Sequence, residues 1–429
     1  MKRWIFILSF FSISAYAQEL DLKTAIEEAL HHSPVVQRAH AQVQEAKWKK
    51  IESYSGLLPT FSADANYLFS KKYALIDVDF SGAVNTIPQI IPTSQLILTG
   101  SIPIFDGMSN INHMRAGSWQ YEAVQNESDW TEFSIRMQTI LFFYKTLASK
   151  NLMEVAIQNE KTIQDHYKDV VNLQKVGVAT KFDVLRVGVQ VNEAEAEVLK
   201  SSDEYEFSKI RLANVMGKES DVRVPYGEFP NLKPDLVASA PDKLERKDIQ
   251  AMSEQSKSLS LIYQSNNKFW VPKLSIFGQL QAYNNINDEF SDWDAYREAY
   301  QVGFNLHWNI FDGAVSISKS KQSHAQAIAS QNNVRIASLQ ASEDAEIWKK
   351  KYLYFCKIMD VKNSQTQKAQ EAVRLANESV RAGTKTNSDL IDAELDLFRS
   401  RADVLNAHMG LVEALINYQM ATGNQVYDF

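Results

Sequence analysis

Four segments of the chain alternate apolar and polar residues with a period of two. Every second residue from Val302 to Ile310 is apolar, for example. Such alternation is typical of a strand with one apolar and one polar face, and about ten residues is the length of a tilted strand that crosses a bilayer. A soluble two-sheet sandwich would show the same pattern, although four matched lengths favour the membrane. The predicted strands are Thr60–Phe69, Gln95–Ile104, Lys273–Tyr283 and Gln301–Ile310.

A helical pattern follows each pair of strands. Between Gly107 and Gly177 there is no proline, and Gly117 is the one glycine. At about 1.5 Å per residue this segment predicts a helix of about 105 Å, whereas globular helices average about 11–12 residues. Glycine turns at Gly177 and Gly383 are expected to end two such rods, and a return arm follows each turn.

The two halves of the chain repeat each other at a fixed offset. Ile104-Phe105-Asp106-Gly107 recurs as Ile310-Phe311-Asp312-Gly313, and 310 − 104 = 206. One offset that holds over about a hundred residues is expected of helical hairpins, whose arms must keep their lengths. The sequence therefore predicts an internal duplication. Further pairs at this offset are Gly177 and Gly383, Thr180 and Thr386, Asp183 and Asp389, Ala196 and Ala402, Leu199 and Leu405, and Gly217 and Gly423.

The return arms carry heptad repeats of apolar residues. Spacings of four and three alternate along the second arm, as in the seam of a coiled coil. A further row recurs at every seventh residue of both arms, so that the apolar stripe is about 150° wide and suits a cylinder of helices. The seam is Ile391, Leu395, Phe398, Ala402, Leu405, Met409, Val412 and Ile416, and the rows are Val184, Val191, Val198, Tyr205, Leu212 and Leu390, Leu397, Val404, Leu411, Tyr418.

The remaining segments divide the chain into two repeats. Amphipathic helices are expected at Pro34–Ser55 and about Asp248–Trp270, and strand-to-strand loops at Ser70–Ser94 and Asn284–Glu298. The second loop is rich in acidic residues, as expected of a loop exposed to solvent. These residues are Asp288, Glu289, Asp292, Asp294 and Glu298. The predicted organisation is a signal peptide at 1–17, a first repeat at 18–217, a proline-rich linker at 218–247, a second repeat at 248–423 and a tail at 424–429.

The N-terminus has the three parts of a secretory signal peptide. Lys2 and Arg3 precede an apolar run at 4–13, and Ala15-Tyr16-Ala17 offers a cleavage site. The run is too short for a membrane anchor, and no cysteine stands at the cleavage point, so lipid attachment is not expected. Since the mature chain lacks an apolar stretch of spanning length, an exported chain is expected to be soluble, peripheral or inserted as strands.

Composition narrows the class of protein. The 429 residues include 15 glycines and 10 prolines, too few for the turns of a large all-β protein. A formal charge of −7 without a long basic run argues against nucleic-acid binding, and the single cysteine, Cys356, allows no internal disulfide. No nucleophile–base constellation, phosphate loop or metal-ligand spacing is found, so we expect no enzyme, cofactor or metal. His31 and His32 are adjacent, His40 is isolated, and His307 is expected on the polar face of a strand.

Four strands cannot close a sheet on themselves. Open sheet edges are excluded from lipid, and single-chain outer-membrane barrels begin at about eight strands. If the strands cross a membrane, the chain must form a dimer with eight strands or a trimer with twelve. Side chains fill an eight-stranded barrel, whereas twelve strands leave room for a channel.

In their order and spacing these features resemble the TolC-like outer-membrane efflux protein family over nearly the whole mature chain. The resemblance rests on Leu20-Asp21-Leu22-Lys23-Thr24-Ala25, Gly56-Leu57-Leu58-Pro59, both Phe-Asp-Gly motifs, both glycine turns and Met420-Ala421-Thr422-Gly423. It implies a mainly α fold with membrane β: a homotrimer with a 12-stranded outer-membrane β-barrel, four strands per chain, continued by a long α-helical periplasmic barrel.

The resemblance also implies a function and partners. Members of the family act as the passive exit duct of a tripartite efflux pump or a type I secretion system, gated at the periplasmic helix tips. The implied partners are outer-membrane lipid, a periplasmic adaptor (membrane fusion) protein and an inner-membrane transporter of the RND, ABC or MFS class. The implied location is the cell outer membrane, with the helical tunnel in the periplasm.

Candidate site residues follow from the resemblance and lie at the helix turns. Acidic residues narrow the tunnel in the family, and they match Asp389 and Asp392 here. Lys385 matches a basic latch residue that reaches the neighbouring hairpin, where Phe182 and Asp183 align. Adaptor docking is expected at Val176, Gly177, Val178, Ala382, Gly383 and Thr384.

Other interpretations of these residues remain open. An aromatic latch residue of the family falls at Val380 and a threonine at Phe182, which departs from a polar latch. From spacing alone, Asp389 and Asp392 are also the acids that a helix N-terminus favours. A ring of six carboxylates would select cations, raise some carboxyl pKa values and give a conductance that weakens at low pH.

A second class of protein would share part of the pattern. A periplasmic coiled-coil adaptor or scaffold without a pore would have the hairpins, but it would not need two pairs of alternating strands of spanning length.

Overall fold

The computed structural model describes residues 19–70, 75–80, 82–88, 91–220, 223–238, 244–287 and 289–429. The predicted signal peptide and Asp288 lie outside this part of the chain. The chain divides into two compact units. The first comprises residues 1–42, 126–250 and 336–429, and the second comprises residues 43–125 and 251–335.

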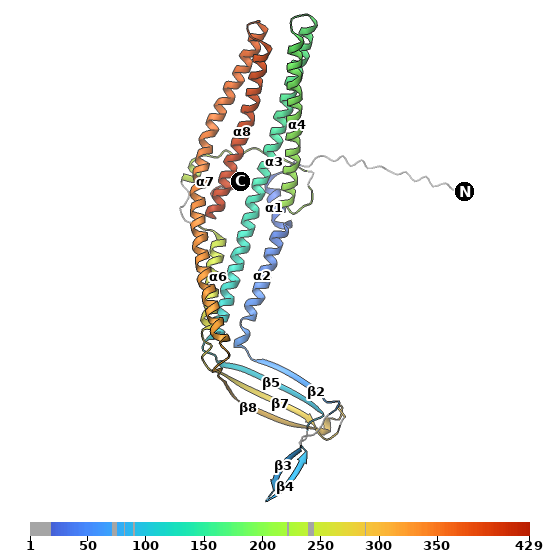
Figure 1. Cartoon of the computed structure of the whole chain (residues 1–429), viewed down its shortest axis with the longest axis vertical. Helices are drawn as coiled ribbons and strands as arrows, with labels where there is room; N and C mark the ends of the chain where they lie inside the picture. Colours follow the sequence, from blue (N-terminus) through green and yellow to red (C-terminus); the bar gives the residue numbers. More distant parts are fainter. Residues whose placement is uncertain are drawn as a thin grey trace, which may run out of the picture. The chain divides into compact units, whose positions relative to one another are not determined.

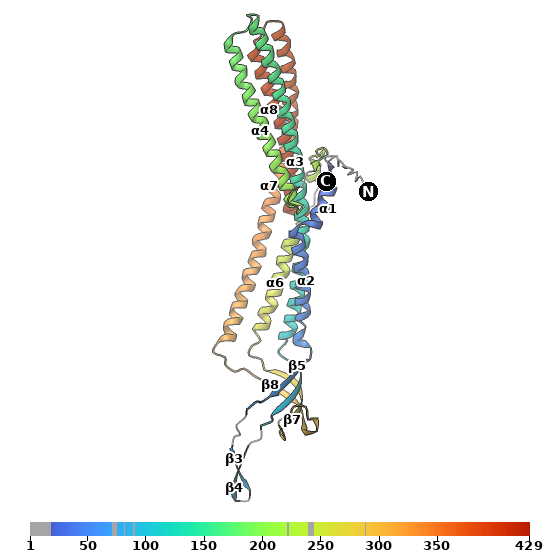
Figure 2. The same ribbon diagram turned by 90° about the vertical axis from the view of Figure 1, so that its right-hand side faces the viewer.

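Two helices of equal length dominate the chain, as predicted. Helix α3 spans Ser109–Lys175 and α7 spans Val315–Arg381, with 67 residues each. Their return arms are α4 (Lys181–Val215) and α8 (Asn387–Thr422). The two hairpins run side by side in the first unit (Figure 1, Figure 2).

Two of the shorter helices, α2 (Pro34–Glu52) and α6 (Lys247–Asn266), lie close to their predicted places. The other two are α1 (Leu22–His32) and α5 (Asp235–Ala238). In the second unit α6 packs on α3, where the Ser258 hydroxyl donates to the Ala116 carbonyl at 2.9 Å. The prediction was wrong in extent, since α2 ends before Ser55 and α6 ends before Trp270.

Four antiparallel strands form the main sheet in the order β2-β5-β7-β8. Their bounds are β2 Thr60–Tyr67, β5 Ser94–Phe105, β7 Lys273–Asn284 and β8 Tyr296–His307. The last strand was predicted at 301–310, and this placement was wrong at both ends. Pairing sets the start, because Tyr296 faces Asn284 at the end of β7. After β8, the Trp308 indole donates to the Trp270 carbonyl at 3.1 Å.

Two predicted connections contain structure that the sequence did not indicate. Within the predicted loop Ser70–Ser94, β3 (Leu75–Phe80) and β4 (Ala83–Pro88) form a separate antiparallel hairpin. The predicted linker 218–247 contains α5 and β6 (Val224–Pro225), which pairs in parallel with β1 (Glu19–Leu20). The predicted loop Asn284–Glu298 was too long, because a 3-10 turn at Trp293–Ala295 leads directly into β8.

The core of the first unit joins both repeats. Phe143 of α3, Tyr352 of α7 and Leu415 of α8 are at most 1 % exposed and belong to one apolar cluster. The Tyr352 hydroxyl donates to the Lys233 carbonyl at 2.8 Å, which fixes the segment between the repeats. The C-terminal tail packs here as well, with the Phe429 ring 5.8 Å from that of Tyr144.

Each repeat ends on a glycine with a left-handed backbone. Gly217 has φ 76° and Gly423 has φ 74°. A Cβ at Gly217 would lie 2.5 Å from the carbonyl oxygen of His32, and one at Gly423 would lie 2.6 Å from the backbone nitrogen of Arg246. Both backbones therefore need glycine for its conformation and for its lack of a side chain.

Alanine at Gly217 is expected to destabilise the protein by about 2 kcal/mol or more, because strain and a backbone clash add. Gly188 of α4 is the matched control, since a Cβ there would meet the Tyr167 ring at an ordinary 3.6 Å. Gly188→Ala is expected to stabilise by about 0.5–1 kcal/mol through helix propensity. Thermal unfolding followed by circular dichroism tests both, and equal effects of the two substitutions would contradict this account.

Candidate functional site

The two Phe-Asp-Gly motifs form identical turns from strand to long helix. Gly107 and Gly313 have φ 70° and 68°, and the next residues, Met108 and Ala314, both have φ 69°. A left-handed backbone is unusual for a residue with a side chain, so a pair of them in each repeat is a strong geometric signature. The repeated sequence therefore encodes a repeated backbone turn.

The aspartate of each motif binds the first turn of the helix that follows. Asp106 Oδ2 accepts from the Asn110 backbone N–H at 2.7 Å, and Asp312 Oδ2 accepts from the Ser316 N–H at 3.0 Å. The Ser316 hydroxyl also donates to Asp312, which lowers the pKa of that carboxyl below its ordinary value. Asp106 and Asp312, the aspartates of the two repeat motifs, thus each have a structural role at a helix N-terminus.

The tips of the two hairpins have the same geometry. Gly177 and Gly383 have φ 79° and 74°, and the N–H of the residue after each glycine donates to a carbonyl five residues earlier at 2.9 Å. This is the Schellman ending of a helix. Val176 and Val178 are 72 % and 73 % exposed, so the first tip presents apolar side chains to its surroundings.

Matching capping boxes follow the tips. Thr386 accepts from the Asp389 N–H at 3.3 Å, while Asp389 Oδ2 accepts from the Thr386 N–H at 2.8 Å and from its hydroxyl at 2.7 Å. Thr180 and Asp183 repeat this arrangement at the start of α4. The threonine contacts lower the pKa of both aspartates.

The structure therefore gives Asp389 and Asp183 a role as helix caps. The contacts within one chain lower the pKa of Asp389, which is the opposite of the rise expected from a crowded ring. Asp392 lies one helical turn further on and is exposed. Lys385 and Phe182, predicted as latch residues with Asp183, are exposed, and no salt bridge joins Lys385 to Asp183 within the described chain.

One polar contact between the hairpins was not predicted. His166 Nε2 of α3 lies 2.9 Å from Glu394 Oε1 of α8, and both side chains are largely buried. The signal was present in the sequence, because each residue falls at helical spacing beside apolar positions, Ile163 and Ile391. Only the fold, however, brings together two residues 228 positions apart.

The register of the main sheet sorts its side chains onto two faces. Successive residues of a strand point to opposite sides, so each row across the sheet belongs to one face. One row is Ala63, Leu98, Leu280 and Tyr300, and the adjacent row on the opposite face is Ser62, Thr99, Gln279 and Gln301. The sheet thus has an apolar face and a polar face, and His307 lies on the polar one, as predicted.

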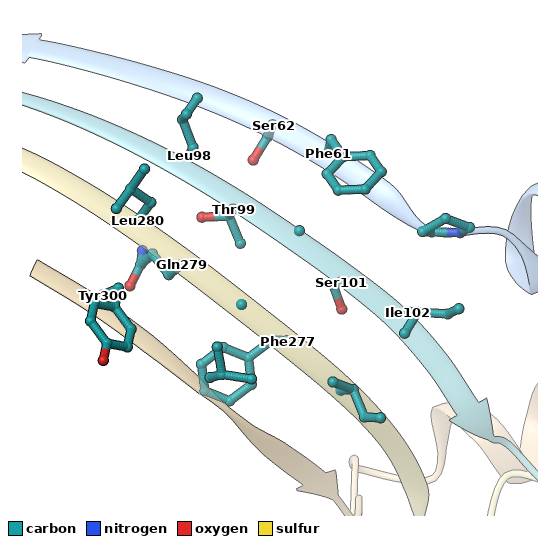
Figure 3. A pocket seen from close by; sticks show the side chains of 15 residues that line it. Phe61, Ser62, Leu98, Thr99, Ser101, Ile102, Phe277, Gln279, Leu280 and Tyr300 are labelled. Carbon is teal, nitrogen blue, oxygen red and sulfur yellow. The ribbon is translucent and has the colours of Figure 1, made fainter.

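The apolar face is hollowed where two strands pair through glycines. Gly100 of β5 faces Gly278 of β7, and a shallow cavity of about 650 Å³ lies around them. Figure 3 shows Phe61, Leu98 and Leu280 around this part of the sheet. The apolar side chains on this face are exposed in the single chain, with Phe61 at 82 %.

None of the described helices combines the length and the apolar composition needed to cross a membrane. The described residues contain no group of three or more acidic, histidine or cysteine side chains arranged to hold a metal ion. Cys356 packs beside Tyr352, and burial raises the pKa of its thiol, as expected of a packed side chain and not of a reactive one.

The chain contains a duplicated unit of paired strands and a long helical hairpin, and one face of its sheet is apolar. The chain belongs to the outer membrane efflux protein family, whose model matches residues 25–218 and 243–424. Members of this family are transport channels of the outer membrane. A comparison with curated protein sequences found no significant match.

Solved channel structures share the fold at low sequence identity. The outer membrane protein VceC from Vibrio cholerae is 16 % identical, with a TM-score of 0.79 over 94 % of this chain and 96 % of that chain. The outer-membrane channel MtrE from Neisseria gonorrhoeae, in its open state, is 18 % identical, with a TM-score of 0.74 over 94 % and 89 %. The outer-membrane channel CmeC from Campylobacter jejuni is 13 % identical, with a TM-score of 0.77 over 94 % and 85 %.

Proposed function

We propose that three copies of this chain form the passive exit duct of a tripartite efflux pump or a type I secretion system, gated at the hairpin tips. The observation that carries the proposal is a four-stranded sheet with an apolar face, in which β2 and β8 are the edge strands among the described strands. In lipid such edges must be paired. Strand directions alternate across the sheet, so β8 of one copy can meet β2 of the next in the same antiparallel sense.

The duplication supports the same assembly in the helical part. Within one chain α3 and α8 meet in a cluster that contains Ile163 and Ile391. The 206-residue offset relates α3 to α7 and α4 to α8. The contact equivalent to that of α3 with α8 is therefore a contact of α7 with α4, which would form between two copies of the chain. Apolar side chains on α4, including Leu185 and Leu199, are 62 % and 65 % exposed and available for it. This head-to-tail contact closes into a ring.

Three copies give twelve strands, which leave an open channel, whereas two copies would give a filled barrel of eight. The proposal includes export through the signal peptide at 1–17 without lipid attachment, repeats at 18–217 and 248–423, and outer-membrane lipid around the apolar face. A periplasmic adaptor would dock at the tips, at Gly177 and Gly383, and would link the duct to an inner-membrane RND, ABC or MFS transporter.

The positions near the tips take their proposed roles in this assembly. Asp389 and Asp392 from three copies would form the constriction, while Lys385 would reach Phe182 and Asp183 of the neighbouring hairpin. The cap contact of Asp389 uses one carboxylate oxygen, Oδ2, in both of its hydrogen bonds. Its other oxygen can therefore still face the duct.

Native mass spectrometry of the detergent-solubilised protein tests the assembly. We expect a complex of three chains whose electrophoretic migration changes on heating, as expected of a membrane-inserted β-structure. A monomer with heat-independent migration would contradict the proposal and would favour a coiled-coil scaffold without a pore.

A further inference from the structure

The contact between His166 and Glu394 is a polar link between the two hairpins near their tips. The imidazole Nε2 lies 2.9 Å from one carboxylate oxygen, and the side chains are 19 % and 10 % exposed. His166 precedes the first tip glycine by 177 − 166 = 11 residues, and Glu394 follows the second by 394 − 383 = 11 residues. The pair therefore joins the hairpins at matching distances along the chain from their tips.

Apolar side chains surround the pair. Ile163 and Val170 of α3, Val187 of α4 and Ile391 of α8 form a buried cluster at this level. Ile163 and Val170 flank His166 by three and four positions, so the imidazole shares their helix face. The pair thus lies in a setting where charge is costly unless it is paired.

The positive charge of the His166 imidazolium compensates the buried negative charge of Glu394. Its second carboxylate oxygen, Oε2, is buried and has no hydrogen-bond partner among the described residues. A carboxylate with one unsatisfied buried oxygen is tolerable beside a positive charge and much less so beside a neutral ring. We propose that the His166–Glu394 pair locks the first hairpin to the second and that the lock opens as the pH rises.

The charges around His166 agree with this direction. The hydrogen bond that His166 donates to Glu394 raises the pKa of His166; burial of the ring opposes this shift, and the charges of Glu394, Asp169 and Asp165 add to it. Asp165 is also paired with Lys168 at 2.8 Å on the same helix. Val187 and Ala194 of α4 belong to the buried cluster, and no charged group of α4 is among the causes of the pKa shift of His166.

The sign of the pH effect follows from this raised pKa. A histidine with a raised folded-state pKa contributes its full stabilisation below the ordinary value of about 6.5 and loses it as the pH rises through the folded-state value. Between those values the opening of the contact releases one proton. The opening equilibrium should therefore increase by up to about tenfold per pH unit.

The duplication relates the α3–α8 contact to an α7–α4 contact, and the His166–Glu394 pair occurs only in the first of these two. At the 206-residue offset His166 corresponds to Ala372, and Glu394 corresponds to Gly188. The contact of α7 with α4 of another copy, which the proposed trimer requires, would have no charged pair at this level. The lock would therefore act within each chain and leave the contacts between chains unaffected.

Hydrogen exchange of the purified full-length protein, corrected for the intrinsic rate, tests the lock. Between about pH 6 and about pH 8.5 we expect protection of the wild-type helices around His166 and Glu394 to fall. Protection around Phe143 in the main core should stay constant. Wild-type protection near His166 that does not change with pH would overturn the proposal.

Variants separate the lock from general instability. Glu394→Gln removes the buried charge, and the amide oxygen of the glutamine can accept a hydrogen bond from a neutral imidazole. The pH dependence of protection should therefore vanish in this variant. His166→Gln should abolish the pH dependence as well. Asp396→Asn, an exposed acid two residues along α8, is the matched control and should keep the wild-type dependence. A Glu394→Gln protein that keeps the dependence would refute the lock.

The effect of the lock on transport rests on the proposed function, whereas hydrogen exchange does not. If the chain forms a duct, the resting conductance of the wild-type protein should rise with pH, and that of Glu394→Gln should not. Loss of the exchange effect would reject the lock alone. A monomer in native mass spectrometry would reject the duct alone.

Discussion

Arginine in place of Leu98 is expected to prevent the protein from assembling in the outer membrane. Leu98 lies within β5 on the apolar face, paired with Ala63 and Leu280. If this face meets lipid, a charge near the bilayer midplane costs about 2–4 kcal/mol per chain, and each ring of strands would contain three such charges. The expected result is loss of the heat-modifiable species from the outer-membrane fraction.

Thr99→Arg is the matched control for this experiment. Thr99 follows Leu98 directly but lies in the polar row with Ser62 and Gln279. Because that face is expected to meet water, the arginine should leave assembly close to the wild-type level. Equal loss of assembly in both variants would contradict the assignment of the two faces.

Removal of both Asp389 and Asp392 is expected to abolish the preference of the duct for cations. In a trimer the two positions supply six carboxylates near the tips, and rings of carboxylates attract cations and repel anions. We expect the ratio of cation to anion permeability in single-channel recordings to fall several-fold towards unity in the Asp389→Ala, Asp392→Ala variant. An unchanged ratio would refute the ring.

The capping role of Asp389 requires its own control. Loss of this cap should lower stability, since the helix N-terminus loses an acceptor. Asp183→Ala removes the equivalent cap from α4 without touching the predicted constriction. It should lower stability in the same direction while both predicted constriction residues stay in place.

The direction of the pKa shift also predicts a pH dependence. The hydroxyl and N–H of Thr386 lower the pKa of Asp389, so its charge persists below the ordinary aspartate value of about 3.9. Cation preference from Asp389 should therefore hold through neutral and mildly acidic pH. It should weaken only as the pH falls through this lowered value.

The periodicity of the sequence was sufficient to predict the main elements. Long runs without helix breakers gave α3 and α7, and the alternating runs gave β2, β5 and β7 within about two residues. The start of β8 was misplaced because charged residues such as Arg297 and Glu298 interrupt the apolar pattern. Pairing with β7 sets that boundary, and pairing is not visible in a local pattern.

The local chemistry near the tips was harder to anticipate. Thr180-x-x-Asp183 and Thr386-x-x-Asp389 have the spacing of a capping box, yet these aspartates were assigned roles in a gate. The two roles are compatible in an assembly, but one chain shows only the cap. The pair of His166 and Glu394 could not be predicted for a different reason, because the two residues lie in different repeats of the chain.

The central claim is that copies of this chain enclose a continuous conducting duct. Conductance of the purified wild-type protein in planar lipid bilayers tests it most directly. We predict discrete single-channel steps that prefer cations, from a complex of three chains. Protein that inserts or binds without any conductance, in a preparation free of the other components of a pump, would contradict the claim.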